Sequence, residues 1–281
     1  MAEETIWEKL GTINYKWLYV ISIIAMIYPI LSPMGLPVTI SEPVRGFKDT
    51  IDSLPEGAVV IWQEGGGGSV YDEIRPAMVA AWKVLMSRPI RVIAWSDTSE
   101  GPVILVDTVH KIDPEENYGK VYGEDYVILG YLPGDETATA SVATNIRKSF
   151  STDYFGKSIE GMTVFDGVET GKDVDLIIQI YTGCYNYDWI VRQWVVPLGT
   201  KTLGITMACC GPMLAPYYPE MCQGYLSGTA GGTELEILGG VLGEGAVVSD
   251  AKNLGLFPLM LFIVFGNIAF LYKKYVKKEA R

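Results

Sequence analysis

The sequence predicts an α/β domain in which a Rossmann-like, mostly parallel sheet carries helices on both faces and is inserted between two transmembrane helices. Apolar runs rich in β-branched residues begin 29 to 48 residues apart through the middle of the chain. That spacing leaves room for a crossover helix between parallel strands. Uncharged apolar segments lie near both ends of the 281 residues. A hydrophobic content of 49% and a mean hydropathy of +0.21 exclude a disordered protein.

The first apolar segment, residues 17–36, contains no charged residue. At a rise of about 1.5 Å per residue its twenty residues match a hydrocarbon core of about 30 Å. The apolar part of a secretory signal is shorter, about 7 to 15 residues, and this segment contains Pro29 and Pro33. We therefore predict a transmembrane helix after a short tail of residues 1–16, with a cleaved signal as the alternative.

The central domain is predicted to occupy residues 37–224. Its expected strands are residues 58–62, 90–95, 126–129, 174–180 and 203–207. Its expected helices are residues 71–86, 137–150, 187–195 and 213–226. The β-branched segment 103–112 resembles a strand, but a crossover is required at this point, and we favour a helix.

The predicted ligand-binding residues follow the strands, because ligands bind at the carboxyl ends of the strands in an open parallel sheet. They are Glu64, Gly65, Gly66, Gly67, Gly68, Ser69, Asp97, Asp135 and Glu136. The glycine run could direct backbone N–H groups at an anion. It lacks the Lys-Ser/Thr ending of a P-loop and the GxGxxG spacing of a dinucleotide turn. A tight strand-to-helix turn is favoured, a small-ligand site is the alternative, and no metal or cofactor is predicted.

Two residues qualify as nucleophiles by context. Ser69 follows glycines, which resembles the glycine-rich turn of serine proteases of the ClpP and signal-peptide-peptidase class. Cys209 follows a predicted strand, which resembles the nucleophile turn of caspase-like peptidases. Either nucleophile needs a base within hydrogen-bond reach, and the single histidine, His110, falls on the predicted crossover. Catalysis is therefore the minority hypothesis.

The four cysteines also bear on the environment of the domain. Outside the cytoplasm we expect a disulfide among Cys184, Cys210 and Cys222. A bond between the adjacent Cys209 and Cys210 would be strained.

The C-terminal part begins with a glycine-rich segment, residues 225–254, which we predict to be a neck. The neck is either a flexible linker or a surface that packs against the membrane or a neighbouring subunit. Residues 255–272 are uncharged and are predicted to form the second transmembrane helix. Within it, Gly266 and Asn267 are expected to contact the first helix or another subunit.

Charge sets the predicted orientation. Five basic residues lie in the tail 273–281, which places that end in the cytoplasm. With two spans the amino terminus lies on the same side of the cell membrane, and the central domain is extracytoplasmic. Residues 17–272 carry 29 acidic and 15 basic side chains, a net charge of −14. This balance excludes a nucleic-acid partner, which needs a basic surface.

Several stretches, taken in order, resemble one family. They include PMGLPVTIS, YGEDYVILGYLPGDE, GYLSGTAGGTELE and FGNIAFLY, and the resemblance runs from Pro33 to Tyr272. The chain resembles an uncharacterised family of prokaryotic two-pass membrane proteins with one extracytoplasmic α/β domain between the spans. The resemblance implies the topology and supplies no catalytic residue. The segment GYLSGTAGGTELE departs from the family pattern GLLGGLKGAAEYE because it lacks the lysine. The chain also differs from the family in carrying Cys209 and Cys210.

These observations predict a membrane-anchored extracytoplasmic protein that binds or assembles rather than catalyses. We expect it to be a subunit of a homo-oligomer or of a larger membrane complex, with the lipid bilayer and other membrane subunits as its partners. The alternatives are a membrane-anchored hydrolase or peptidase that uses Cys209 or Ser69, and a sensor of a small ligand.

Overall fold

The computed structural model describes residues 14–32, 34–183, 187–240 and 242–276. The chain divides into two compact units. One comprises Val38–Gly245, and the other comprises Met1–Pro37 together with Ala246–Arg281. Each unit is described separately.

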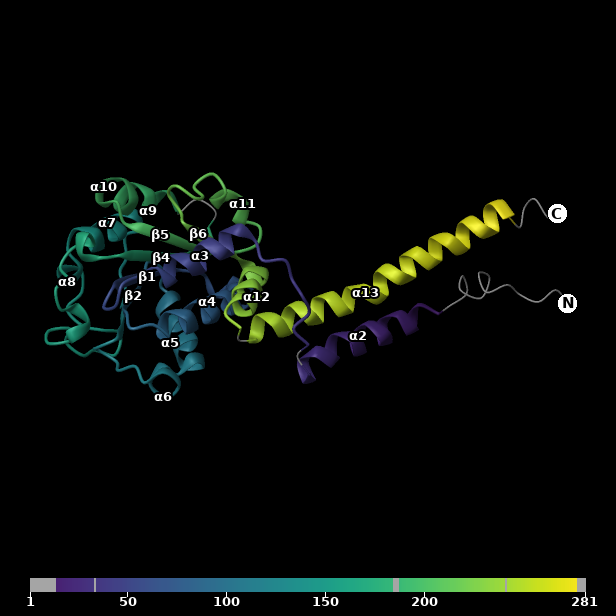
Figure 1. Ribbon diagram of the computed structural model, residues 1–281, viewed down its shortest axis with the longest axis horizontal. Helices are drawn as coiled ribbons and strands as arrows, with labels where there is room; N and C mark the ends of the chain where they lie inside the picture. Colours follow the sequence, from purple (N-terminus) through teal and green to yellow (C-terminus); the bar gives the residue numbers. More distant parts are fainter. Residues whose placement is uncertain (1–13, 33, 184–186, 241, 277–281) are drawn as a thin grey trace. The chain divides into compact units, whose positions relative to one another are not determined.

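The first unit is built on a six-stranded parallel sheet in the order β3-β2-β1-β4-β5-β6 (Figure 1). The strands are β1 (Val59–Gly65), β2 (Arg91–Ser96), β3 (Tyr126–Tyr131), β4 (Leu176–Tyr181), β5 (Lys201–Thr206) and β6 (Gly224–Ser227). The chain starts in the middle of the sheet, moves outward to β3, and then returns to build the other half from β4. Neighbouring strands β1 and β4 therefore lead into connections that diverge, which is the doubly wound, Rossmann-like topology predicted from the sequence.

Helices cover both faces of this sheet. The first face carries α3 (Glu42–Asp52), α4 (Tyr71–Met86), α5 (Gly101–Ile112) and α12 (Gly228–Leu238). The second face carries α7 (Glu136–Thr144), α8 (Ile146–Ser149), α9 (Tyr187–Ile190), a π-helical turn η4 (Val191–Val195) and α10 (Val196–Leu198). Shorter elements in the connections are η1 (Gly68–Val70), α6 (Pro114–Tyr118), η2 (Thr163–Phe165), η3 (Gly171–Asp173) and α11 (Gly211–Leu214).

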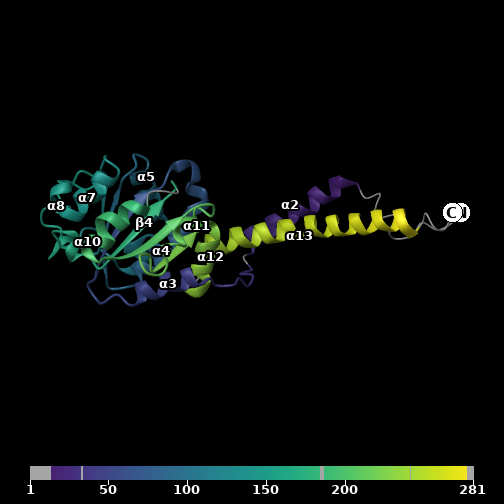
Figure 2. The ribbon, with the colours of Figure 1, turned by 90° about the horizontal axis from the view of Figure 1, so that it is seen from above.

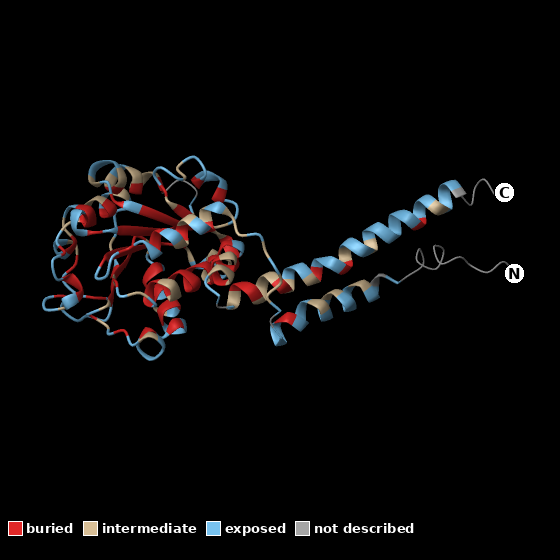
Figure 3. Ribbon diagram, in the orientation of Figure 1, coloured by how far each residue is buried: buried red, intermediate tan, exposed pale blue. Residues whose placement is uncertain are grey.

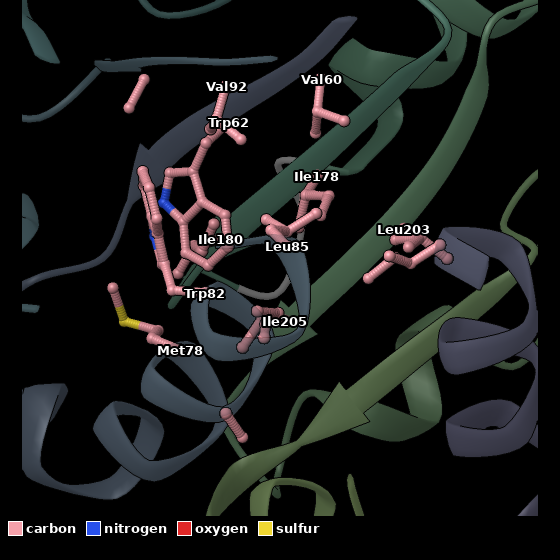
Figure 4. Packing of buried hydrophobic residues seen from close by; sticks show 14 of the residues in the cluster. Val60, Trp62, Met78, Trp82, Leu85, Val92, Ile178, Ile180, Leu203 and Ile205 are labelled. Atoms are coloured by element: carbon pink, nitrogen blue, oxygen red, sulfur yellow. The ribbon is translucent and has the colours of Figure 1, made fainter. Parts of the chain in front are cut away.

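Alternation along β1 supplies both cores. Val60 and Trp62 point to the first face, and Val59 and Ile61 point to the second. The Trp62 ring packs against Trp82 of α4 with centroids 5.2 Å apart (Figure 4). Because both faces are covered, the central strands are buried along their whole length (Figure 3), which explains their nearly continuous apolar sequence.

Most of the predicted elements of the domain are present. The five predicted strands lie within a few residues of their expected bounds, and segment 103–112 is helical, as part of α5. The predicted helix 137–150 is divided into α7 and α8 at Asn145. Asn145 has an extended backbone, and its side chain accepts the N–H of Lys148 at 2.8 Å, so it ends one helix and caps the next.

The predictions for residues 213–226 and for the neck at 225–254 are wrong. Residues 224–227 form β6, which pairs with β5, and α12 and the start of α13 follow directly. The glycines of this segment serve close packing. A Cβ on Gly232 would lie 2.5 Å from the backbone nitrogen of Ala77 in α4, so α12 lies directly against α4. The α/β unit therefore extends to Gly245.

The second unit contains two helices, α2 (Tyr15–Leu31) and α13 (Glu244–Leu271), with a π-helical turn η5 (Tyr272–Val276) after α13. Within the described residues, one helix, Glu244–Tyr275, is long and apolar enough to cross a membrane by the criteria of length and composition. The apolar helix Lys16–Leu31 is shorter. The first predicted transmembrane helix, residues 17–36, is therefore helical only to Leu31. The helix that contains the second predicted span begins at Glu244, before the predicted start at residue 255.

The early end of α2 has a local cause. Asp250 of α13 is 2% exposed, and its carboxylate accepts the backbone N–H groups of Met34, Gly35 and Leu36 at 2.8 to 3.0 Å. Gly35 has a positive φ of 60°, so the chain turns there instead of continuing as a helix.

The two helices run beside each other (Figure 2), and their close contact lies at Gly255. A Cβ there would be 2.4 Å from Cγ of Met26. The predicted contact residues lie elsewhere: a Cβ on Gly266 would meet no described atom within 4 Å, and Asn267 donates to the carbonyl of Ile263 in its own helix at 2.9 Å. The contact between the two helices therefore uses a different small residue from the one predicted.

Candidate functional site

The carboxyl ends of β1, β2 and β3 bring three of the predicted ligand-binding residues, Glu64, Asp97 and Asp135, to one edge of the sheet. We define the strand-end site as Gln63, Glu64, Asp97, Asp135 and Thr139. Gln63 and Glu64 end β1, which pairs with β2 on one side and β4 on the other. Asp97 follows β2, and Asp135 and Thr139 belong to the start of α7 after β3.

Gln63 and Asp97 form a buried polar pair at the centre of this site. The Gln63 side chain is fully buried, and Asp97 is 6% exposed. Nε2 of Gln63 donates to Oδ2 of Asp97 at 2.8 Å and to Oγ1 of Thr139 at 2.9 Å. The other oxygens, Oε1 of Gln63 and Oδ1 of Asp97, are buried and have no hydrogen-bond partner in the described part of the chain. A buried acceptor without a partner costs about 1–3 kcal/mol, so each is a feature that needs a reason.

Asp135 contributes backbone strain beside this pair. Its φ of 51° and ψ of −122° lie in a region that residues other than glycine rarely adopt. The next residue, Glu136, is held firmly: Nε and Nη2 of Arg192 each donate to its carboxylate at 2.8 Å, and Gln193 donates at 2.9 Å. Arg192 lowers the pKa of Glu136 to about 2. This clamp holds the start of α7, and with it the unusual backbone of Asp135.

Arg192 and Gln193 belong to the π-helical turn η4. Such turns are rare in proteins, and those that occur often lie at functional sites. Strained backbone, a π-helical turn and buried unpaired acceptors therefore coincide at one edge of the sheet.

Two carboxyl groups of the site have raised pKa values. The pKa of Asp97 is raised to about 6, chiefly by burial. The hydrogen bond from Gln63 lowers this pKa, and the charge of Asp135 raises it. Burial raises the pKa of Glu64 to about 8, although Trp62 Nε1 and the N–H of Gly66 donate to its carboxylate at 3.2 and 2.9 Å. Strongly shifted acids at a strand edge are typical of functional sites.

The glycine loop after β1 is a tight turn whose N–H groups are already bonded. The N–H of Gly67 donates to Oγ1 of Thr182 at 3.2 Å, and the N–H of Gly68 donates to the carboxylate of Glu100. A Cβ on Gly65 would lie 2.7 Å from the carbonyl oxygen of Ile180, so close strand packing requires glycine there. The loop therefore offers little to a phosphate.

The predicted nucleophiles are not brought to a base. Ser69 lies in η1, Cys209 follows β5, and His110 lies on α5; all three are exposed. In the described contacts, neither Ser69 nor Cys209 has a hydrogen bond with His110, and Cys209 lies beside Cys210, with the two sulfurs 3.9 Å apart.

The remaining cysteines have different states. Cys210 is disulfide-bonded, and Cys222 is a free, buried thiol whose Sγ donates to the carbonyl of Gly224 at 3.2 Å. Burial raises the pKa of Cys222 to about 11. Cys184, the third disulfide candidate, lies outside the described residues.

Sequence reasoning missed the residues that support the site, namely Thr139, Arg192 and Gln193. A signal existed only for Gln63, a polar residue at the end of an apolar strand. Within the described ranges, no group of three or more His, Cys, Asp or Glu side chains is arranged to hold a metal ion. Comparisons with known protein families, curated proteins and solved structures find no match to this chain.

Proposed function

We propose that the protein is a membrane-anchored binding protein whose strand-end site takes a small cation that carries N–H donors. The observation that supports this proposal is the Gln63–Asp97 pair, in which two buried oxygens have no donor among the described residues. An ammonium or guanidinium group would supply donors to both oxygens and would compensate the charge of Asp97.

The charge of the surroundings favours a cation over an anion. Asp97 and Asp135 lie at this edge, and the N–H groups of Gly67 and Gly68 are bonded to oxygens of the chain itself. A phosphate would meet these carboxylates, and the N–H groups of Gly66, Gly67 and Gly68 are already bonded. A neutral polyol could satisfy the acceptors but would leave the carboxylate uncompensated.

The anchoring part of the proposal rests on α13, which is apolar, largely exposed and long enough to span a bilayer. Lys273 and Lys274 follow it, and basic residues favour the cytoplasmic side. We take α2 as the second membrane segment, which leaves the α/β unit outside the cytoplasm. Assembly into an oligomer or a larger complex is compatible with this arrangement and is a separate proposal.

The experiment is thermal unfolding of the full chain in detergent, followed by tryptophan fluorescence, with three probes. Putrescine is the cation, sorbitol the neutral polyol and adenosine diphosphate the anion. We expect putrescine to raise Tm most. The Asp97→Asn variant should lose this increase, because the amide removes the charge and keeps the shape.

The matched control is Asp166→Asn, which removes an exposed carboxylate elsewhere in the same unit. It should retain the response of the wild type. Stabilisation by adenosine diphosphate, the absence of any shift with putrescine, or an equal shift in both variants would each contradict the proposal.

A further inference from the structure

A pocket of about 240 Å³ lies on the first face of the sheet, between α3, the C-terminal half of α4 and α12. Its apolar lining comes from Ala80, Val84 and Leu235. The strand-end site lies where α4 begins, and this pocket lies toward the end of α4. Since α4 has 16 residues, the helix separates its two ends by about 24 Å. The pocket is therefore distinct from the strand-end site.

The formal charges of the four charged side chains that line the pocket sum to zero, but these side chains differ in how they are bonded. Lys48 is paired with Asp52, with Nζ and Oδ2 2.5 Å apart. Glu236 is 5% exposed, and its carboxylate accepts the N–H groups of Gly243 and Gly245, each at 3.1 Å. Lys83, which also lines the pocket, has no ion-pair partner among the residues that the structure describes.

We propose that this pocket binds a small organic anion with an apolar body. Its carboxylate would pair with Lys83, and its body would cover Ala80, Val84 and Leu235. Lys83 is partly exposed and lies beside this apolar lining, whereas both carboxylates of the pocket are bonded within the chain, so a ligand carboxylate placed here has a cation to pair with.

The dimensions and polarity narrow the ligand class. The pocket is smaller than the range of about 300–1,000 Å³ typical of drug-sized ligands, so the occupant is correspondingly small. Inorganic phosphate would leave the apolar lining exposed to water. Tyr118 lines the same pocket, and burial raises its pKa, which keeps the hydroxyl protonated as a donor.

The test uses fluorine NMR of para-fluorobenzoate added to the full chain in detergent. The matched probe is para-fluorobenzylamine, which has the same ring and the opposite charge. We expect line broadening of the anion in the presence of protein and a much smaller effect on the cation. Empty detergent micelles give the background for each probe.

Three variants locate the binding. Lys83→Met removes the charge and should weaken binding about threefold or more. Val84→Phe, at a partly exposed position of α4, should fill the pocket and abolish binding. Lys201→Met removes an exposed lysine at the start of β5 and should bind as the wild type does.

Two results would overturn the proposal. One is the absence of broadening above the micelle background in wild-type protein. The other is broadening that persists equally in Lys83→Met and Val84→Phe. The Tm of each variant is measured as a control. A variant that keeps the Tm of the wild type is folded, so a loss of binding in that variant is not caused by unfolding.

Discussion

The Glu64 carboxyl should make the stability of the protein fall as the pH rises. It is fully buried at the end of β1, and its pKa is raised from 4.5 to about 8, chiefly by burial. Between these two values the unfolded chain has lost the proton and the folded chain keeps it. The folded state therefore binds more protons, and the free energy of unfolding decreases as the pH increases through this window.

The size of the effect follows from the two pKa values. One pKa unit corresponds to about 1.4 kcal/mol, so raising the pH from about 6 to about 8 should remove roughly 2 kcal/mol of stability. For a unit of about 200 residues this lowers Tm by about 4–8 °C. Asp97 has a pKa of about 6, so its effect on the free energy of unfolding falls mainly below pH 6.

Glu64→Gln is the perturbation, because the amide resembles the protonated acid in shape and charge. The assay is Tm of the full chain in detergent, measured by tryptophan fluorescence across the same pH range. The variant should lose most of the decrease and should exceed the wild type in Tm at about pH 8. Glu56→Gln, at an exposed position, should retain the decrease. An equal slope in wild type and Glu64→Gln would refute the reasoning.

Three further predictions concern packing, the helix pair and orientation. Gly232→Ala places a Cβ against the Ala77 backbone, which should cost about 1–3 kcal/mol and lower Tm by several degrees; an unchanged Tm would show that α12 can move. Asp250→Ala removes the acceptor of three N–H groups, so hydrogen exchange at residues 34–36 should become faster, and unchanged protection would argue against this contact. An impermeant maleimide should label Cys209, an exposed free thiol, on intact cells, and lose this labelling in Cys209→Ser; labelling only after lysis would reverse the proposed orientation.

The strand-end residues could be located from the sequence because strand ends in a parallel sheet share one edge. Glu64, Asp97 and Asp135 were predicted on this ground. Their chemistry could not be predicted, because the pKa values depend on burial and on neighbours from other elements. Thr139 and Arg192 lie 76 and 56 residues from their hydrogen-bond partners Gln63 and Glu136, and no local pattern marks such pairs.

The α/β class, the parallel strands and their crossovers can be predicted from the residues alone, because alternation, β-branched content and spacing are local properties of the chain. The folded chain was needed to show that the glycine-rich segment that begins at Gly224 completes the sheet as β6 and packs on α4 as α12. Glycine has no side chain whose polarity shows whether it faces solvent or another backbone, so close packing and a flexible linker look alike in sequence. For the same reason the contact between Met26 and Gly255 could not be predicted, because it joins two helices that are far apart in the sequence and close in space.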